Sequence, residues 1–140
     1  MRFWDSSAVV PLVVREENSD RVRTWVEDDE DMVVWTLTQV EVRSALSRMA
    51  REGRLGADDL HQATQDADDL LRQFHTVESL SAVKNRAKRL PMLHPLRNAD
   101  AMQLAAALIA CSDDPLGFQF VTLDARLSNA ARSEGFRVRP

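Results

Sequence analysis

The sequence predicts an α/β fold with an open, mainly parallel β-sheet that is flanked by helices on both faces. Short apolar runs typical of buried strands alternate along the chain with segments in which apolar residues recur at helical spacing. Strands separated by helices favour parallel pairing through right-handed crossovers. With 140 residues, of which 44% are hydrophobic and 29% charged, the chain is expected to form one globular domain over residues 1–140.

The first elements are short. Residues 2–5 form an apolar run that ends in a carboxylate, which is typical of a buried strand and its exit. The serines at 6–7 are suitable helix caps, so a helix is predicted over 8–14. A second amphipathic helix is predicted to begin at Ser19. The acidic run 27–31 has no apolar anchor, and we expect it to form solvated surface.

The middle of the chain contains a strand and two long helices. Residues 32–35 are predicted to form the second buried strand. Thr38 followed by Glu41 is a capping-box pattern, in which the acid reaches back to the threonine amide. It predicts a helix that stops near Gly53. Residues 57–74 carry one apolar stripe, with aspartates beside it, and predict an amphipathic helix.

The next segment is basic. Residues 75–80 are predicted to form a short strand or extended turn, and residues 81–90 a helix with several lysines and arginines. Pro91 and Pro95 are expected to bracket a brief rigid connection.

The last part begins with an alanine-rich helix. Residues 96–110 are almost wholly apolar after position 100, which predicts a buried helix. Turn residues at 112–117 precede the strongest strand pattern of the chain, at 118–123. A helix over 125–133 and a short strand over 136–139 are predicted to complete the sheet.

Composition limits the classes of function. The net charge of -4 argues against a protein that coats nucleic acid by bulk positive charge, although a local basic patch or a metal ion can still bind phosphate. Cys111 is the only cysteine, so an intrachain disulfide or a multi-cysteine zinc site is excluded. There is no leader-like N-terminus and no apolar run of membrane-spanning length, so we expect a cytoplasmic protein that does not bind membranes.

Four carboxylates are expected to meet at one edge of the sheet. Asp5 and Asp124 follow predicted strands, whereas Glu41 and Asp100 lie in the first turns of helices that open toward the same edge. In such sheets, ligands bind beyond the carboxyl ends of the strands. Taken singly, each acid is also compatible with a helix cap.

Taken together, the four acids favour a metal site, because gathered like charges repel unless a cation neutralises them. An all-oxygen donor set without cysteine favours Mg²⁺ or Mn²⁺ over zinc or copper. Such a site is suited to hydrolysis of phosphodiester bonds.

Four stretches in this order resemble the signature segments of PIN-domain ribonucleases, and the resemblance is strongest to VapC-type toxins of toxin–antitoxin pairs. The stretches are 3–8 (FWDSSA), 38–41 (TQVE), 97–105 (RNADAMQLA) and 121–127 (VTLDARL). The resemblance implies a metal-dependent endoribonuclease whose acidic quartet, Asp5, Glu41, Asp100 and Asp124, binds one or two Mg²⁺ or Mn²⁺ ions.

Three further residues carry over from the resemblance. Ser6 and Thr122 stand at positions where a hydroxyl group orients a carboxylate or a water molecule. Arg97 stands where an arginine meets a phosphate or pairs with a carboxylate. The alternatives are a simple helix cap for Ser6 and a surface charge for Arg97.

The resemblance also implies an RNA substrate, a homodimer and a small antitoxin protein that inhibits the enzyme. Because the acidic site is negative, RNA must be held from its rim by basic residues. The candidates are Arg43, Arg48, Arg51, Arg54, Lys84, Arg86, Lys88, Arg89 and Arg97.

Three other functions remain open from the residues alone. A PIN-like binding module without catalysis and a related DNA nuclease are both compatible with the same motifs. A phospho-acceptor receiver domain shares the alternation of strands and helices, but it requires paired acids after the first strand and a lysine at a later strand end. Here Asp5 is followed by serines, and Asp124 stands near where that lysine is needed.

Overall fold

The computed structural model describes residues 1–29 and 31–139, and its centre is a five-stranded sheet in the order β3-β2-β1-β4-β5. Every neighbouring pair of strands is parallel, which confirms the predicted α/β class. The strands are β1 (Arg2–Trp4), β2 (Met32–Trp35), β3 (His75–Val77), β4 (Gln119–Val121) and β5 (Arg137–Arg139).

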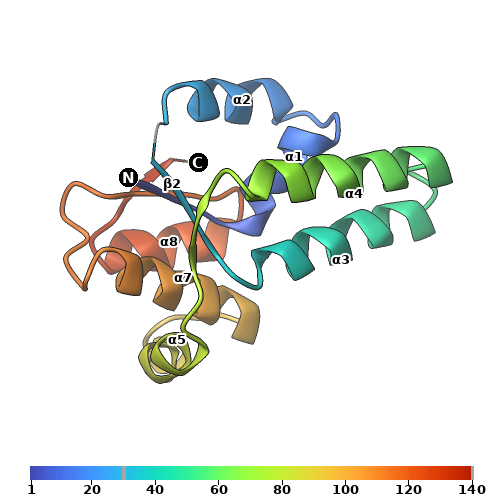
Figure 1. Ribbon diagram of the computed structural model, residues 1–140. Coiled ribbons are helices and arrows are strands. Elements are labelled where there is room, and N and C mark those ends of the chain that lie inside the picture. Colours follow the sequence, from blue (N-terminus) through green and yellow to red (C-terminus); the bar gives the residue numbers. More distant parts are fainter. Residues whose placement is uncertain (30, 140) are drawn as a thin grey trace.

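Helices cover both faces of this sheet (Figure 1). One face packs against α1 (Ser6–Val13), α2 (Ser19–Glu27), α3 (Thr38–Arg51) and α4 (Ala57–Leu71). The other face packs against α5 (Leu80–Ala87), α6 (Leu90–Leu93), α7 (Asn98–Ala110) and α8 (Ala125–Ser133). Because side chains alternate along a strand, Phe3 enters the core beneath α7 and its neighbour Trp4 enters the opposite core.

The sheet has a topological switch point between β1 and β4. These two strands are neighbours, with Trp4 opposite Val121. The chain leaves β1 into helices on one face and leaves β4 into a helix on the other face. The two connections therefore diverge at the carboxyl ends of the strands, and this is where open α/β sheets bind ligands.

The predictions for Pro91 and for the acidic run 27–31 need correction. Pro91 lies within the short helix α6, where its fixed φ angle and missing amide are tolerated because first-turn amides have no helical partner. In the acidic run, Asp29 is buried, because the buried indole of Trp4 donates a hydrogen bond to its Oδ2 at 2.9 Å. Glu30, in the same run, lies outside the described residues.

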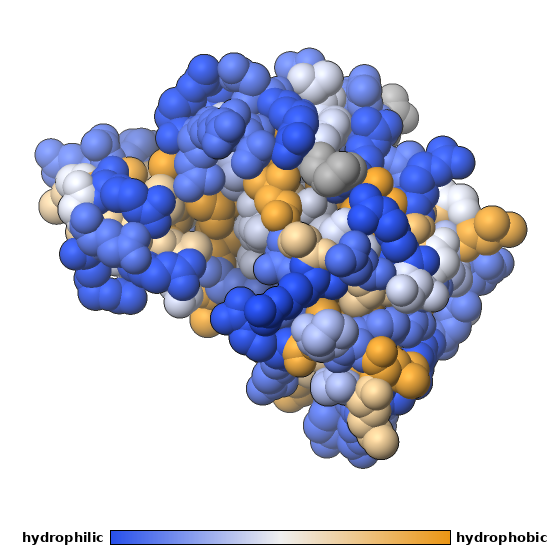
Figure 2. All heavy atoms as spheres, turned by 180° about the vertical axis from the view of Figure 1, so that it is seen from behind, coloured by the Kyte–Doolittle hydropathy of each residue, from blue (hydrophilic) through white to orange (hydrophobic). Residues whose placement is uncertain are grey.

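Hydrophilic residues cover most of the face seen in Figure 2, where hydrophobic atoms surface in scattered patches and in a hollow near the centre. The large apolar side chains with the most exposure are Leu37, Val40, Leu80, Met92, Leu93 and Leu116. Among the described residues, no helix has both the length and the apolar character that crossing a membrane requires.

Candidate active site

Asp5 links the two strands of the switch point. It follows β1 and caps α1, with its carboxylate accepting hydrogen bonds from the Ser7 amide at 3.2 Å and the Ser7 hydroxyl at 2.5 Å. Thr122, just after β4, donates its hydroxyl hydrogen to the same oxygen at 2.9 Å. Asp5 is therefore the N-cap of α1, and the serines at 6–7, which were predicted to be the caps, lie in the first turn of the helix.

Asp124 lies beside this pair and caps α8. Its Oδ1 accepts a hydrogen bond from the Leu127 amide at 2.8 Å. Its own amide donates to the hydroxyl oxygen of Thr122 at 3.1 Å. Thr122, which is fully buried, thus connects the two acids that follow neighbouring strands.

Glu41 does not form the predicted capping box. The N-cap of α3 is Leu37, so Thr38 is already helical and Glu41 lies in the first turn. Its side chain turns toward the site, where Oε2 accepts a hydrogen bond from the Ser6 hydroxyl at 2.8 Å. Its Oε1 accepts from Nε2 of Gln103 at 3.2 Å. Ser6 therefore holds an acid of another helix.

Asp100 occupies the first turn of α7, as predicted. Its Oδ2 is buried and has no hydrogen-bond partner among the described residues. The nearest cation is Nε of Arg97 at 4.0 Å, on a side chain that is 79% exposed. A buried carboxylate oxygen without a partner is costly, so it is a position at which a ligand is expected.

Electrostatics connects the four acids. Burial is the largest cause that raises the pKa of Asp5, Glu41 and Asp100. Repulsion between neighbours adds to it: Asp100 raises the pKa of both Asp5 and Glu41, and Asp124 raises that of Asp100. Within residues 1–29 and 31–139, however, no three acidic, histidine or cysteine side chains lie close enough to form a metal-binding group.

Sequence reasoning missed Ser7 and Gln103. Gln103 is fully buried and also donates from Nε2 to the hydroxyl oxygen of Thr38 at 3.1 Å. It lies three residues after Asp100, on the same side of an otherwise apolar helix. The signal that could have identified Gln103 is a polar residue three positions after Asp100 in an otherwise apolar helix.

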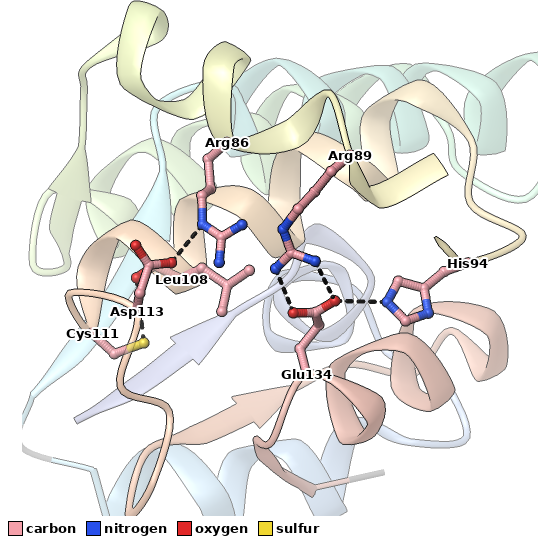
Figure 3. Close-up of polar contacts among 7 residues, drawn as sticks. All are labelled: Arg86, Arg89, His94, Leu108, Cys111, Asp113 and Glu134. Carbon is pink, nitrogen blue, oxygen red and sulfur yellow. Dashed lines mark hydrogen bonds and ion pairs between the residues drawn. The ribbon is translucent and has the colours of Figure 1, made fainter. Parts of the chain in front are cut away.

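Several of the basic residues predicted to hold RNA are engaged within the molecule. Figure 3 shows Arg86 paired with Asp113, and Arg89 bound through both terminal nitrogens to Glu134, which also contacts His94. The other engaged pairs are Arg43 with Asp68 and Arg54 with Glu52. Arg48, Arg51, Lys84 and Lys88 are exposed and form no ion pair with the part of the chain that the structure describes.

Comparisons with known proteins agree with this arrangement. The model of the PIN domain family matches residues 2–133. Ribonuclease VapC49 of Mycobacterium tuberculosis is 33% identical over 138 residues, which cover 99% of this chain and 94% of the relative.

Two solved structures share the fold at low identity. One is VapC20 of Mycobacterium tuberculosis, described as a sarcin-ricin loop cleaving toxin, with a TM-score of 0.68, 19% identity and full coverage of both chains. The other is a toxin–antitoxin complex from Klebsiella pneumoniae, with a TM-score of 0.64 and 14% identity over 90% of this chain and 88% of that one. With the family match over nearly the whole chain, these findings show that the chain belongs to the PIN-domain family, among its VapC-type members.

Proposed function

We propose that this protein is a metal-dependent endoribonuclease that acts as the toxin of a toxin–antitoxin pair. The observation that carries the proposal is the buried, unpartnered Oδ2 of Asp100, a residue whose charge is coupled to those of the three other acids at the carboxyl edge of the sheet. The ribonuclease name of VapC49, a relative over nearly the whole chain, supports the same activity. The proposal takes residues 1–140 as a single nuclease domain.

The donor set fits Mg²⁺ or Mn²⁺. Asp5, Glu41, Asp100 and Asp124 offer only carboxylate oxygens, which these ions prefer. Burial and the neighbouring Asp124 raise the pKa of Asp100; a cation there would offset the repulsion from Asp124 and would give the free oxygen of Asp100 a partner. Mg²⁺ is commonly held by one or two carboxylates together with water and substrate phosphates, so a closed cage of protein ligands is not required.

The neighbouring residues orient the acids. When bound, such a cation lowers the pKa of water and offsets charge on the phosphate. Ser7 and Thr122 fix the carboxylate of Asp5, and Ser6 and Gln103 fix that of Glu41. The exposed Arg97, beside Asp100, is free to reach a phosphate oxygen of the substrate.

The partners follow from the family. A toxin–antitoxin complex is among the solved structures with this fold, and this supports an antitoxin as the protein's inhibitor. We include a homodimer and a cytoplasmic location in the proposal on the same grounds.

The test is incubation of the full chain with total RNA in the presence of Mn²⁺ or of a chelator. We expect cleavage only with the metal, and we expect Asp100→Asn to abolish it. Asp58→Asn removes the same charge from an exposed position in the first turn of α4, and it should cleave as the wild type does.

Two results would contradict the proposal. Intact RNA at every metal concentration would indicate a PIN-like binding module without catalysis. Cleavage of DNA in preference to RNA would indicate a related DNA nuclease. Mapping the ends of the cut RNA would also show which sequence or structure the enzyme selects.

A further inference from the structure

A hollow of about 250 Å³ is lined in part by Asp124. It is formed by the start of α2, by the segment that follows β4, and by one side of α8. Its polar lining includes Asn18, Arg21, Asp124, Ser128, Asn129 and Arg132. Helix α8 follows β4, and α2 follows α1, which itself follows β1, so the hollow lies beside the crevice at the switch point.

The two arginines of this hollow differ from those in Figure 3. Arg86 and Arg89 are neutralised by carboxylates, whereas neither Arg21 nor Arg132 forms an ion pair with any residue that the structure describes. They carry positive charge in a hollow that Asp124 also lines, on a chain whose net charge is -4. Unpaired arginines in a concave site next to an acidic centre are suited to an anionic ligand.

Arg21 is already held in place. Its guanidinium lies over the indole ring of Trp25, 5.4 Å from the ring centroid, and it donates a hydrogen bond to Oδ1 of Asn18 at 2.8 Å. These contacts restrict the side chain before any ligand binds, which reduces the entropy that binding would cost.

Arg132 shares one side of α8 with the acid at the helix start. Asp124, Ser128 and Arg132 are spaced four residues apart, so they lie in a row along the helix. This row begins at Asp124, one of the four proposed site acids, and ends at Arg132 in the last turn of α8. A phosphate bound by Arg132 would therefore lie on the path of the same RNA strand as one bound among the acids.

We propose that this hollow is a subsite for a backbone phosphate of single-stranded RNA, next to the phosphate that is cleaved. The polymer's identity rests on the proposed function, but the preference for a phosphate rests on the unpaired arginines and the amide groups around them. Arginine binds phosphate in a two-pronged geometry, and such contacts position a nucleic acid without reading its bases.

The test measures binding separately from cleavage. The probe is a short, fluorescein-labelled, single-stranded RNA of mixed sequence, whose Kd is measured by anisotropy in the Asp100→Asn background. We expect Arg132→Ala and Arg21→Ala each to weaken binding about tenfold. The slope of log Kd against log salt should fall by about 0.7 for each phosphate that the variant no longer binds.

Arg137→Ala is the matched control. Arg137 begins β5 and so lies at the amino ends of the strands, opposite to the acids. It is exposed and forms no ion pair within the described residues, so its removal changes net charge equally. It should leave Kd nearly unchanged. In the background that retains Asp100, the two test variants should raise KM for RNA while kcat and Mn²⁺ affinity stay at the wild-type values.

The outcomes separate this inference from the proposed function. If RNA is cleaved with Mn²⁺ but all three arginine variants bind it alike, the subsite is wrong and the activity stands. If binding depends on Arg132 and Arg21 but nothing is cleaved, the subsite stands and the ribonuclease proposal is wrong. Loss of Mn²⁺ affinity in the test variants would show that they disturb the acids and would overturn the subsite.

Discussion

Nε2 of Gln103 lies 3.2 Å from Oε1 of Glu41, so α7 supplies both an acid of the site and the group that orients another acid. The same nitrogen also donates to the hydroxyl oxygen of Thr38, so one buried amide group binds two residues of α3. Burying an amide is costly unless it is hydrogen-bonded, and here both bonds of Nε2 are made to residues of α3, whereas the buried Oε1 has no hydrogen-bond partner among the described residues. Gln103 is therefore expected to act as a positioning residue.

Replacing Gln103 by leucine tests this role. The variant keeps the size and burial of the side chain but leaves Glu41 with the Ser6 hydroxyl as its only remaining side-chain donor among the described residues. Groups that orient metal ligands typically contribute 10- to 100-fold to metal affinity or activity, so we expect decreases of about that size. Mn²⁺ titration followed by electron paramagnetic resonance measures the affinity, and RNA cleavage measures kcat.

Gln39→Leu is the control for this change. Gln39 also lies in α3 and donates to a carboxylate, that of Asp68 at 2.8 Å, but outside the acidic cluster. It should bind Mn²⁺ as the wild type does. Equal Mn²⁺ affinity in Gln103→Leu and the wild type would show that Gln103 only packs the core.

Asp100→Asn is expected to stabilise the metal-free protein at neutral pH. Burial and the neighbouring Asp124 raise the pKa of Asp100 above its ordinary value of 3.8. The folded state therefore holds this proton more tightly than the unfolded state, and stability falls as pH rises from the unfolded pKa through the folded pKa. Asparagine does not ionise, so the variant does not lose this stability as pH rises.

Thermal melts across pH check the expectation. The melting temperature of Asp100→Asn should exceed that of the wild type at pH 7. The difference should shrink as pH falls through the unfolded pKa of about 4, because well below that pH the wild-type carboxyl is protonated in both states. Mn²⁺ should stabilise the wild type more than the variant. A variant that melts lower at pH 7 would indicate that Asp100 is a structural cap.

The sequence could predict that the four acids follow strands or begin helices, and the resemblance singled out Ser6 and Thr122, but neither could predict which acid each partner contacts. Asp5 and Asp124 were visible because strand ends and helix starts follow from local patterns, and parallel strands bring such ends to one edge. The capping box was wrong because its local pattern ignores contacts across the fold: Glu41 is bound by Ser6 and by Gln103. These pairings join α3 to α1 and α7, and no periodicity encodes them.

The fold was easier to predict than these pairings, because it depends on local patterns along the chain. The parallel sheet follows from the alternation of strands and helices, and α8 begins and ends at the predicted residues. The burial of Asp29 could not be predicted, because it depends on the indole of Trp4 reaching it from a distant strand. Local composition predicts a solvated loop, and one long-range hydrogen bond reverses the result for that residue.

Ser6 and Ser7, adjacent in sequence, should give different phenotypes as alanine variants. Ser7 donates to Asp5, accepts from the Leu123 amide at 2.9 Å and thereby joins α1 to the segment after β4. Ser7→Ala leaves a buried acid short of donors and should cost about 1–3 kcal/mol of stability. Ser6→Ala removes mainly the partner of Glu41, so it should lower Mn²⁺ affinity with little change in melting temperature.

Urea denaturation and Mn²⁺ titration of both variants separate the two roles. Each protein serves as the control for the other, since both lose one hydroxyl from the first turn of the same helix. Equal destabilisation by the two substitutions would contradict the expectation that Ser7, which joins α1 to the segment after β4, contributes more to stability than Ser6 does.

Glu134→Gln should destabilise the protein in a pH-dependent way. Glu134 is mostly buried at the end of α8, where the hydrogen bonds from Arg89 lower its pKa and His94 lies 2.8 Å away (Figure 3). A lowered folded-state pKa gives stability that is present above the unfolded pKa and is lost as pH falls through the folded pKa. The variant should therefore be less stable by about 1–3 kcal/mol at pH 7, and the difference should close in acid. Glu52→Gln breaks the exposed pair with Arg54 and should cost less than about 1 kcal/mol. Equal losses in the two variants would show that the partly buried pair of Glu134 contributes no more than a surface pair.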